Sequence, residues 1–243
     1  MFSNELSLFL IATFTSTLAG ICAMGGGMIL VLVLPFFVPV TAIIPIHGIT
    51  QFASNSSRLA LCFSHVHWPF VGQFIVGAIV GTLLFSVFLV NISSQFLPLF
   101  ISVYLLITLW FKPIEIAFSR FESFYIVGAI QAGLGLLVGA PGPITVTLLY
   151  KKLTDKEQII ATASLLMGIT NLNKVLVYSV IGFQFFEYWQ LILAAVIGAT
   201  IGSILGTYLR DKIPNQHFMN LLKLILTGLA SYTTIVTILK ISI

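Results

Sequence analysis

The stretch HGITQFASNSSR, residues 47–58, decides how the chain is interpreted, because it places a cation inside an otherwise apolar segment. His47, Gln51, Asn55 and Arg58 follow one another at intervals of four, four and three residues, so on a helix their side chains form one polar stripe. A central arginine or lysine costs roughly 2.5–3.5 kcal/mol on membrane-insertion scales, and such a residue therefore indicates a functional site. The stripe predicts a site for an anion within the membrane.

A second motif, NLNK at residues 171–174, repeats part of this pattern later in the chain. In both motifs an asparagine precedes the cation by three residues, and Asn55 and Arg58 lie 116 positions before Asn171 and Lys174. At a spacing of 121 positions, Trp68, Gly77 and Gly81 match Trp189, Gly198 and Gly202. Such matches are typical of duplicated transporter halves, and the small-residue pairs predict close helix packing.

The composition places the chain in the membrane. Hydrophobic residues make up 58% of its 243 residues and charged residues 7%, and the mean hydropathy is +1.10. These values predict an all-α polytopic membrane protein. The net charge of +4 is ordinary for basic cytoplasmic loops and does not indicate a nucleic-acid partner.

Two apolar regions are interrupted by helix-breaking residues. The first contains Gly25, Gly26 and Gly27, and the second contains the sequence GAPGP at residues 139–143. The limbs after the breaks would extend only about 20 Å and about 12 Å, short of the ~30 Å hydrocarbon core. We therefore expect two broken or re-entrant hairpins, at about 6–40 and about 124–150.

The spacing of the apolar runs predicts two inverted repeats with six full crossings. Residues 1–112 form the first repeat, with its hairpin and spans at about 44–64, 69–90 and 95–111. Residues 113–122 form a cytoplasmic connection, and residues 123–243 form the second repeat, with its hairpin and spans at about 158–182, 189–209 and 217–239.

The orientation follows from the loop cations. If each hairpin returns to its own side, seven of them share one side: Lys112, Arg120, Lys151, Lys152, Lys156, Arg210 and Lys212. Only Lys240 then lies on the other side. The positive-inside rule favours this arrangement, with the seven cations in the cytoplasm. Both termini are expected to be external, in a multi-pass protein.

The inverted topology predicts that Arg58 and Lys174 approach each other near the middle of the membrane. No Asp or Glu occurs in any predicted span, so neither cation has an obvious counter-ion there, which favours a mobile small anion as their partner. The competing interpretations are a snorkelling Arg58 and a structural ion pair of Lys174. The predicted hydrogen-bonding and backbone contacts to the anion come from Gln51, Asn55, Asn171, Asn173, Gly25, Gly26, Gly27, Gly139 and Gly142.

Several alternatives stay open at this point. His47 is about as well explained as a helix-end histidine as by a role with a coupling proton or ion, and the sequence leaves a homodimer open. The chain lacks the HExxH, GxSxG and P-loop patterns, so we expect no enzyme, no ATP coupling and no metal or other cofactor. A passive channel for anions or small solutes and a non-transporting membrane scaffold are the other functional classes.

The two hairpins resemble those of a known family. Gly20, Gly25 to Gly27 and Pro35 in the first hairpin, with Gly135, Gly139, Gly142 and Pro143 in the second, are similar to the paired motifs of the sulfite exporter TauE/SafE family, in the toluene sulfonate uptake permease superfamily. The resemblance implies a secondary transporter, acting as an exporter by alternating access in the bacterial inner membrane. Its implied substrates are sulfite, sulfonates and related anions such as sulfoacetate.

Overall fold

The computed structural model describes residues 4–22, 25–91, 93–210, 212 and 215–241, and the regular elements in these ranges are helices. This confirms the all-α class. Within the described ranges, five segments are long and apolar enough to cross a membrane, which makes this a polytopic membrane protein. They lie in α1 (Asn4–Cys22), α4 (Trp68–Asn91), α9 (Lys156–Val180), α10 (Trp189–Leu209) with the short η5 (Phe185–Tyr188) before it, and α11 (Asn215–Ile241).

Two expected spans are absent from that group for physical reasons. Helix α3 (Ile43–Cys62) has 20 residues, but the polar stripe from His47 to Arg58 lowers its hydropathy. Helix α5 (Leu97–Trp110) is apolar but has only 14 residues, and it is preceded by η4 (Ser94–Phe96). The number of complete crossings and the division into repeats stay predictions.

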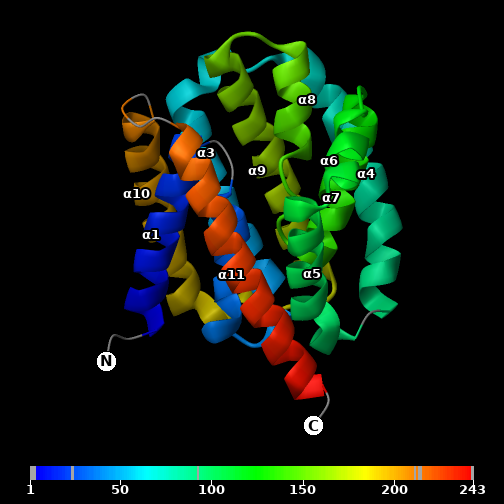
Figure 1. Cartoon of the computed structure of the whole chain (residues 1–243), viewed down its shortest axis with the longest axis vertical. Helices are drawn as coiled ribbons and strands as arrows, with labels where there is room; N and C mark the ends of the chain where they lie inside the picture. The colour runs from blue at the N-terminus through cyan, green and yellow to red at the C-terminus, as the bar shows by residue number, and fades with distance from the viewer. Residues whose placement is uncertain (1–3, 23–24, 92, 211, 213–214, 242–243) are drawn as a thin grey trace.

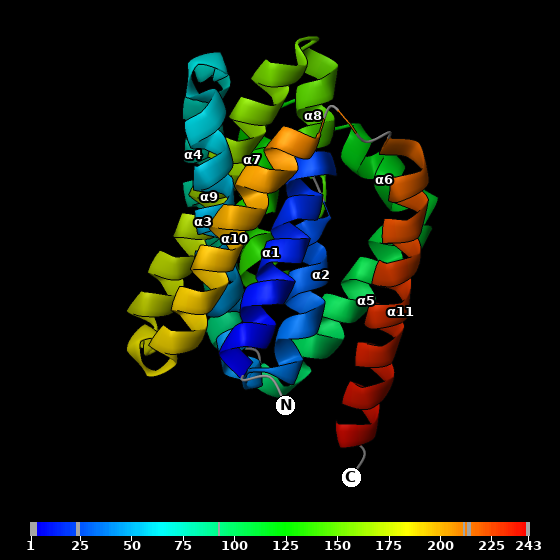
Figure 2. The same cartoon turned by 90° about the vertical axis from the view of Figure 1, so that its left-hand side faces the viewer.

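Both glycine-rich breaks separate the two limbs of a helical hairpin. The first hairpin pairs α1 with α2 (Gly26–Val33), which continues into η1 (Leu34–Phe36) and η2 (Val40–Ala42). The second pairs α7 (Phe124–Val138) with α8 (Ile144–Lys152). In both views the first hairpin opens toward the end of the molecule where α1 begins and α11 ends, and the second opens toward the opposite end (Figures 1 and 2).

We call the end of the molecule where α1 begins and α11 ends the terminal end, and we call the opposite end the basic end. The basic end carries α6 (Lys112–Ser119), the last turn of α8 with Lys151 and Lys152, and the end of α10 (Figure 1). Helix α6 lies in the predicted connection at 113–122, so that connection is partly helical. The short η3 (Phe63–His65) follows α3 at this end.

The hairpins pack across the two halves rather than within them. Helix α1 lies along α10, and α7 lies along α4 (Figure 2). A Cβ atom added to Gly202 would lie 2.1 Å from the Thr13 carbonyl oxygen, and one added to Gly81 would lie 2.0 Å from that of Ala129. Thr13 and Ala129 are 116 positions apart, so the two contacts are equivalent. The small-residue pairs therefore serve helix packing, as predicted.

The centre of the molecule is the crossing of α3 and α9. A Cβ added to Gly48 would lie 3.2 Å from the Cβ of Lys174, so the two helices are in close contact beside the buried cations. The two breaks also touch. A Cβ on Gly139 would lie 2.8 Å from Val31 of α2, and one on Gly142 would lie 3.5 Å from the Met28 methyl carbon. The hairpins and the crossing helices thus meet in one region.

Candidate anion site

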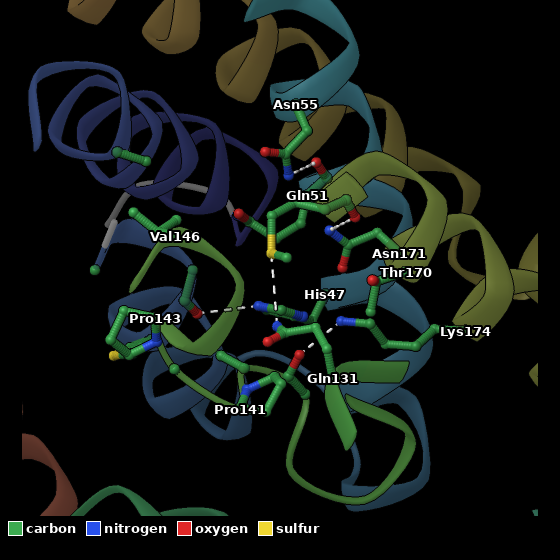
Figure 3. A pocket seen from close by; sticks show the side chains of 18 of the residues that line it. His47, Gln51, Asn55, Gln131, Pro141, Pro143, Val146, Thr170, Asn171 and Lys174 are labelled. Atoms are coloured by element: carbon green, nitrogen blue, oxygen red, sulfur yellow. Dashed lines mark hydrogen bonds between the residues drawn. The ribbon is translucent and has the colours of Figure 1, made fainter. Parts of the chain in front are cut away.

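A cavity of about 100 Å³ lies where the two breaks meet the crossing of α3 and α9 (Figure 3). Both halves of the chain contribute to its walls, through α1 to α3 and through α7 to α9. Most of the residues predicted to form the site line this cavity: His47, Gln51, Asn55, Arg58, Asn171, Lys174, Gly25, Gly27, Gly139 and Gly142. Their role in binding a substrate stays a prediction.

Arg58 is a buried cation whose Nε atom lacks a partner among the described residues. Its side chain is only 5% exposed, and its Nε atom has no hydrogen-bond partner in the part of the chain that the structure describes. It lies a full turn before the end of α3 and does not snorkel to the surface. An unpaired charge is expensive to bury, so the cavity in front of Arg58 is suited to an anion.

Lys174 is also buried, with 1% exposure, but it has a partner. Its Nζ atom donates a hydrogen bond of 2.6 Å to the carbonyl oxygen of Gly139. Gly139 is the C-terminal cap of α7 and has a φ of 73°, a conformation that suits glycine. A cation at a helix C-terminus is favourable because it meets carbonyls that lack partners within the helix. Lys174 therefore fixes one side of the second break.

His47 lies between the two breaks rather than at a membrane interface. The side chain is 2% exposed, and its Nε2 atom is 3.0 Å from the Gly27 carbonyl oxygen, to which it donates. A Cβ on Gly139 would lie 3.7 Å from its Nδ1, which has no partner among the described residues. With Nε2 as the donor, Nδ1 of a neutral ring is an acceptor, and protonation turns it into a second donor. The ring therefore contacts both hairpins.

The amide side chains of the two repeated motifs have the same conformation. Asn55 donates through Nδ2 to the carbonyl of Gln51 at 2.7 Å, and Asn171 donates to the carbonyl of Met167 at 2.8 Å. Each amide keeps a second N–H and its oxygen, because a primary amide has two donors. Nε2 of Gln51 has no partner among the residues described. These groups face the cavity together with Arg58.

The structure does not bring two predicted residues to the cavity. Nδ2 of Asn173 donates to the hydroxyl of Thr82 on α4 at 3.4 Å, because a residue two positions from Asn171 points to the other side of α9. Gly26 serves packing instead, since a Cβ there would lie 1.9 Å from the carbonyl oxygen of Thr15. Asn173 and Gly26 are therefore not among the residues that line this cavity.

Several residues that the sequence motifs did not mark also line the cavity. Thr170 precedes Lys174 by one helical turn, and this spacing alone would have placed it on the same face. Gln131 of α7 is 2% exposed and donates to the sulfur of Met167 at 3.5 Å. It also accepts from Thr145 at 3.4 Å, and no motif in the sequence marks it. An apolar wall faces these polar groups, formed by Met28, Pro141, Pro143 and Val146.

The backbone at both breaks also faces the cavity. Gly25 and Gly142 have φ values of 92° and 93°, so the chain turns sharply there, and α2 and α8 begin just after these turns. The first N–H groups of a helix have no partner within it and carry partial positive charge. Two such helix starts at one cavity add to the positive potential of the buried cations.

Helical hairpins broken in mid-molecule, packed crosswise around a small cavity with buried cations, define a membrane transporter of the broken-helix type. The family described as "Sulfite exporter TauE/SafE" matches residues 8–233, nearly the whole chain, and the chain belongs to that family. It is thus a membrane transporter of sulfur anions. Searches of the curated proteins and of the solved structures found no match.

Proposed function

We propose that the protein is a secondary transporter that exports small sulfur oxyanions, such as sulfite, sulfonates or sulfoacetate, from bacteria across the inner membrane. The observation that carries this proposal is the buried guanidinium group of Arg58, which borders the central cavity and whose Nε lacks a partner in the described residues. An anion there would accept charge-assisted hydrogen bonds, which are about twice as strong as neutral ones.

The rest of the lining supports an anionic rather than a cationic ligand. Lys174 and the amides of Gln51 and Asn171 can donate hydrogen bonds, and no Asp or Glu is among the described residues that line the cavity. A carboxylate would be expected in a site for a cation. The donors also come from both halves, so a bound anion would connect α3 with α9.

The size of the cavity supports a small ligand. Its volume of about 100 Å³ is well below the ~300–1,000 Å³ of pockets for drug-sized molecules. A water molecule has a share of ~30 Å³ in the liquid, so a few waters or one small oxyanion fill the space. The small volume favours a compact anion such as sulfite, and the apolar wall suits the short organic part of a small sulfonate.

The proposed mechanism is alternating access around this cavity. The basic end would face the cytoplasm, because loop cations are enriched on that side, and the terminal end would face outward. The hairpins would rearrange around the bound anion so that the cavity opens to one end at a time. Coupling to a proton through His47, which contacts both breaks, stays a prediction.

Transport in proteoliposomes would test the proposal. Sulfite uptake is expected to saturate with concentration and to show counterflow, and empty liposomes provide the control. A passive channel would instead give non-saturable flux without counterflow. In a separate thermal-shift measurement, sulfite is expected to stabilise the purified protein in a saturable manner, because a ligand that binds only the folded state stabilises it. A scaffold protein would show neither flux nor stabilisation.

A further inference from the structure

A second cavity, of about 400 Å³, lies at the terminal end of the molecule. Its walls come from η2, η4, the end of α9 and η5, which lie at that end in both views (Figures 1 and 2). We call it the outer cavity. Its polar lining residues are Thr41, Ser94, Tyr178, Gln184, Glu187 and Tyr188.

The central and outer cavities follow each other along one face of α9. Thr170 and Lys174 line the central cavity, and Tyr178 and Ile181 line the outer one. Intervals of four, four and three residues keep these side chains on one side of a helix. Lys174 and Tyr178 are separated by only about 6 Å along the axis, at 1.5 Å per residue.

The C-terminal end of α7 contacts α9 at one residue from the lining of each cavity. The hydroxyl of Tyr178 donates to the carbonyl of Leu136 at 3.1 Å, and Lys174 donates to that of Gly139 at 2.6 Å. Leu136 is completely buried, and Tyr178 is 5% exposed. The last carbonyl groups of a helix have no partner within the helix, so these two side chains satisfy carbonyl groups at the end of α7. Two hydrogen bonds from α9 therefore fix the end of α7.

We propose that the end of α7, held by Tyr178 and Lys174, is the gate between the anion site and the terminal end, and that the outer cavity is the mouth of the pathway. This inference rests on the proposed function. Separation of the end of α7 from α9 would join the two cavities. The ammonium group that holds Gly139 also lines the central cavity, so an anion bound there would contact the same group that holds the gate.

The charge of the outer cavity suits release rather than binding. Glu187 contributes a carboxylate, and among the described residues that line this cavity there is no Lys, Arg or His. An anion that passes the gate leaves a site with buried cations and enters one with a repelling group. The outer cavity is therefore a passage for the anion and not a second binding site.

Cysteine labelling without any anion tests the gate. In a chain with Cys22→Ser and Cys62→Ser, one reporter is Thr170→Cys in the central cavity and the other is Gln184→Cys in the outer cavity. A membrane-impermeant maleimide is applied to each face of sealed vesicles. Gln184→Cys is expected to react from one face only, which identifies the terminal end, and Thr170→Cys is expected to react from that face much more slowly.

Tyr178→Phe removes only the hydroxyl that reaches Leu136. A hydrogen bond of this kind contributes ~0.5–1.5 kcal/mol, so labelling of Thr170→Cys from the terminal end should rise about 2- to 10-fold. Lys174→Met should raise it as well. The matched control is Tyr188→Phe, because Tyr188 lines the same cavity and its hydroxyl has no hydrogen bond within the described residues. It should leave the rate unchanged.

Three results would overturn the gate. They are unchanged labelling in both Tyr178→Phe and Lys174→Met, an equal rise in Tyr188→Phe, or no reaction of Gln184→Cys from either face. None of these results bears on anion binding. Conversely, a wild-type protein that neither binds nor transports sulfite would refute the proposed function and leave the labelling result intact.

Discussion

The helices that carry the buried cations, α3 and α9, occupy equivalent places in the two halves but differ in how their cations are paired. Lys174 donates to Gly139 in the break of its own half, whereas the Nε of Arg58 has no partner in the described chain. One turn further, the equivalent residues are Tyr178, which reaches its hairpin, and Cys62, whose sulfur donates back to α3. The comparison teaches that two buried cations at equivalent positions can differ in their partners, and we expect Arg58 to depend more on a ligand than Lys174 does.

Other features are the same in both halves and belong to the scaffold. Asn55 and Asn171 make the same hydrogen bond to the preceding turn of their helices, and Gly81 and Gly202 make the same close contact with a hairpin helix of the other half. At the cavity, by contrast, equivalent side chains of the two halves differ. His47 is a further difference between the halves, because the equivalent position, 116 residues later, is Ala163.

The largest expected effect concerns the shared scaffold. Gly81→Ala and Gly202→Ala would each place a methyl group about 2 Å from a backbone carbonyl oxygen, so helices must separate. Overpacking of this kind costs ~3 kcal/mol at the upper end of its usual range, and equivalent contacts should cost the same. Thermal unfolding in detergent measures both variants. Gly228→Ala is the control because a Cβ there meets nothing within 4 Å, and unequal losses would contradict the equivalence.

The next effect separates the two cations by function. Arg58→Met is expected to weaken sulfite binding about 100-fold, since a hydrogen bond to a charged group contributes ~1.5–3 kcal/mol and Arg58 offers several donors. The ligand-free protein should keep or raise its melting temperature, because an unpaired buried charge is removed. Calorimetric titration and thermal unfolding provide the two measurements. Arg58→Lys, which retains the charge, should bind with intermediate affinity, and unchanged affinity in Arg58→Met would refute the site.

The third prediction sharpens the same contrast through stability. Lys174→Met leaves the Gly139 carbonyl without its donor, and a buried group that loses its partner costs ~1–3 kcal/mol. We expect Lys174→Met to unfold at a lower temperature than Arg58→Met, although both replace a buried cation by methionine. Equal melting temperatures of the two variants would show that Lys174 contributes no more to stability than Arg58 does.

The smallest effect distinguishes two asparagines of one motif. Asn171→Ala should weaken sulfite binding about 5-fold, the equivalent of ~1 kcal/mol for one hydrogen bond. Asn173→Ala should leave binding unchanged, because Asn173 contacts Thr82 outside the cavity. Titration of both variants under the same conditions is sufficient. A greater loss in Asn173→Ala would reverse the assignment of the two faces of α9.

The sequence was sufficient to predict the helical class, the positions of both breaks and most of the cavity lining. Apolar runs, glycine-rich interruptions and helical spacing each depend on local chemistry, which can be read without coordinates. Spacing would also have excluded Asn173, because residues two apart do not share a helix face. Applied consistently, the same rule would have included Thr170.

The roles of neighbouring glycines could not be predicted, because they depend on contacts with distant segments. Gly25 turns the chain with a positive φ, Gly26 packs against the Thr15 carbonyl, and Gly27 accepts a hydrogen bond from His47. Identical residue types gave no means of separating the three. The pairing of Lys174 with a backbone carbonyl was hidden for the same reason, since motifs reveal charges but not the main-chain atoms opposite them.

The crosswise packing of the hairpins has a consequence for motion. Backbone contacts at the glycine pairs join α1 to α10 and α4 to α7, and each pair combines helices that are far apart in the sequence. Any rearrangement that preserves these backbone contacts must displace α1 together with α10, and α4 together with α7. For the proposed alternating access we therefore expect composite moving units that mix the first and second parts of the polypeptide, rather than the predicted sequence repeats.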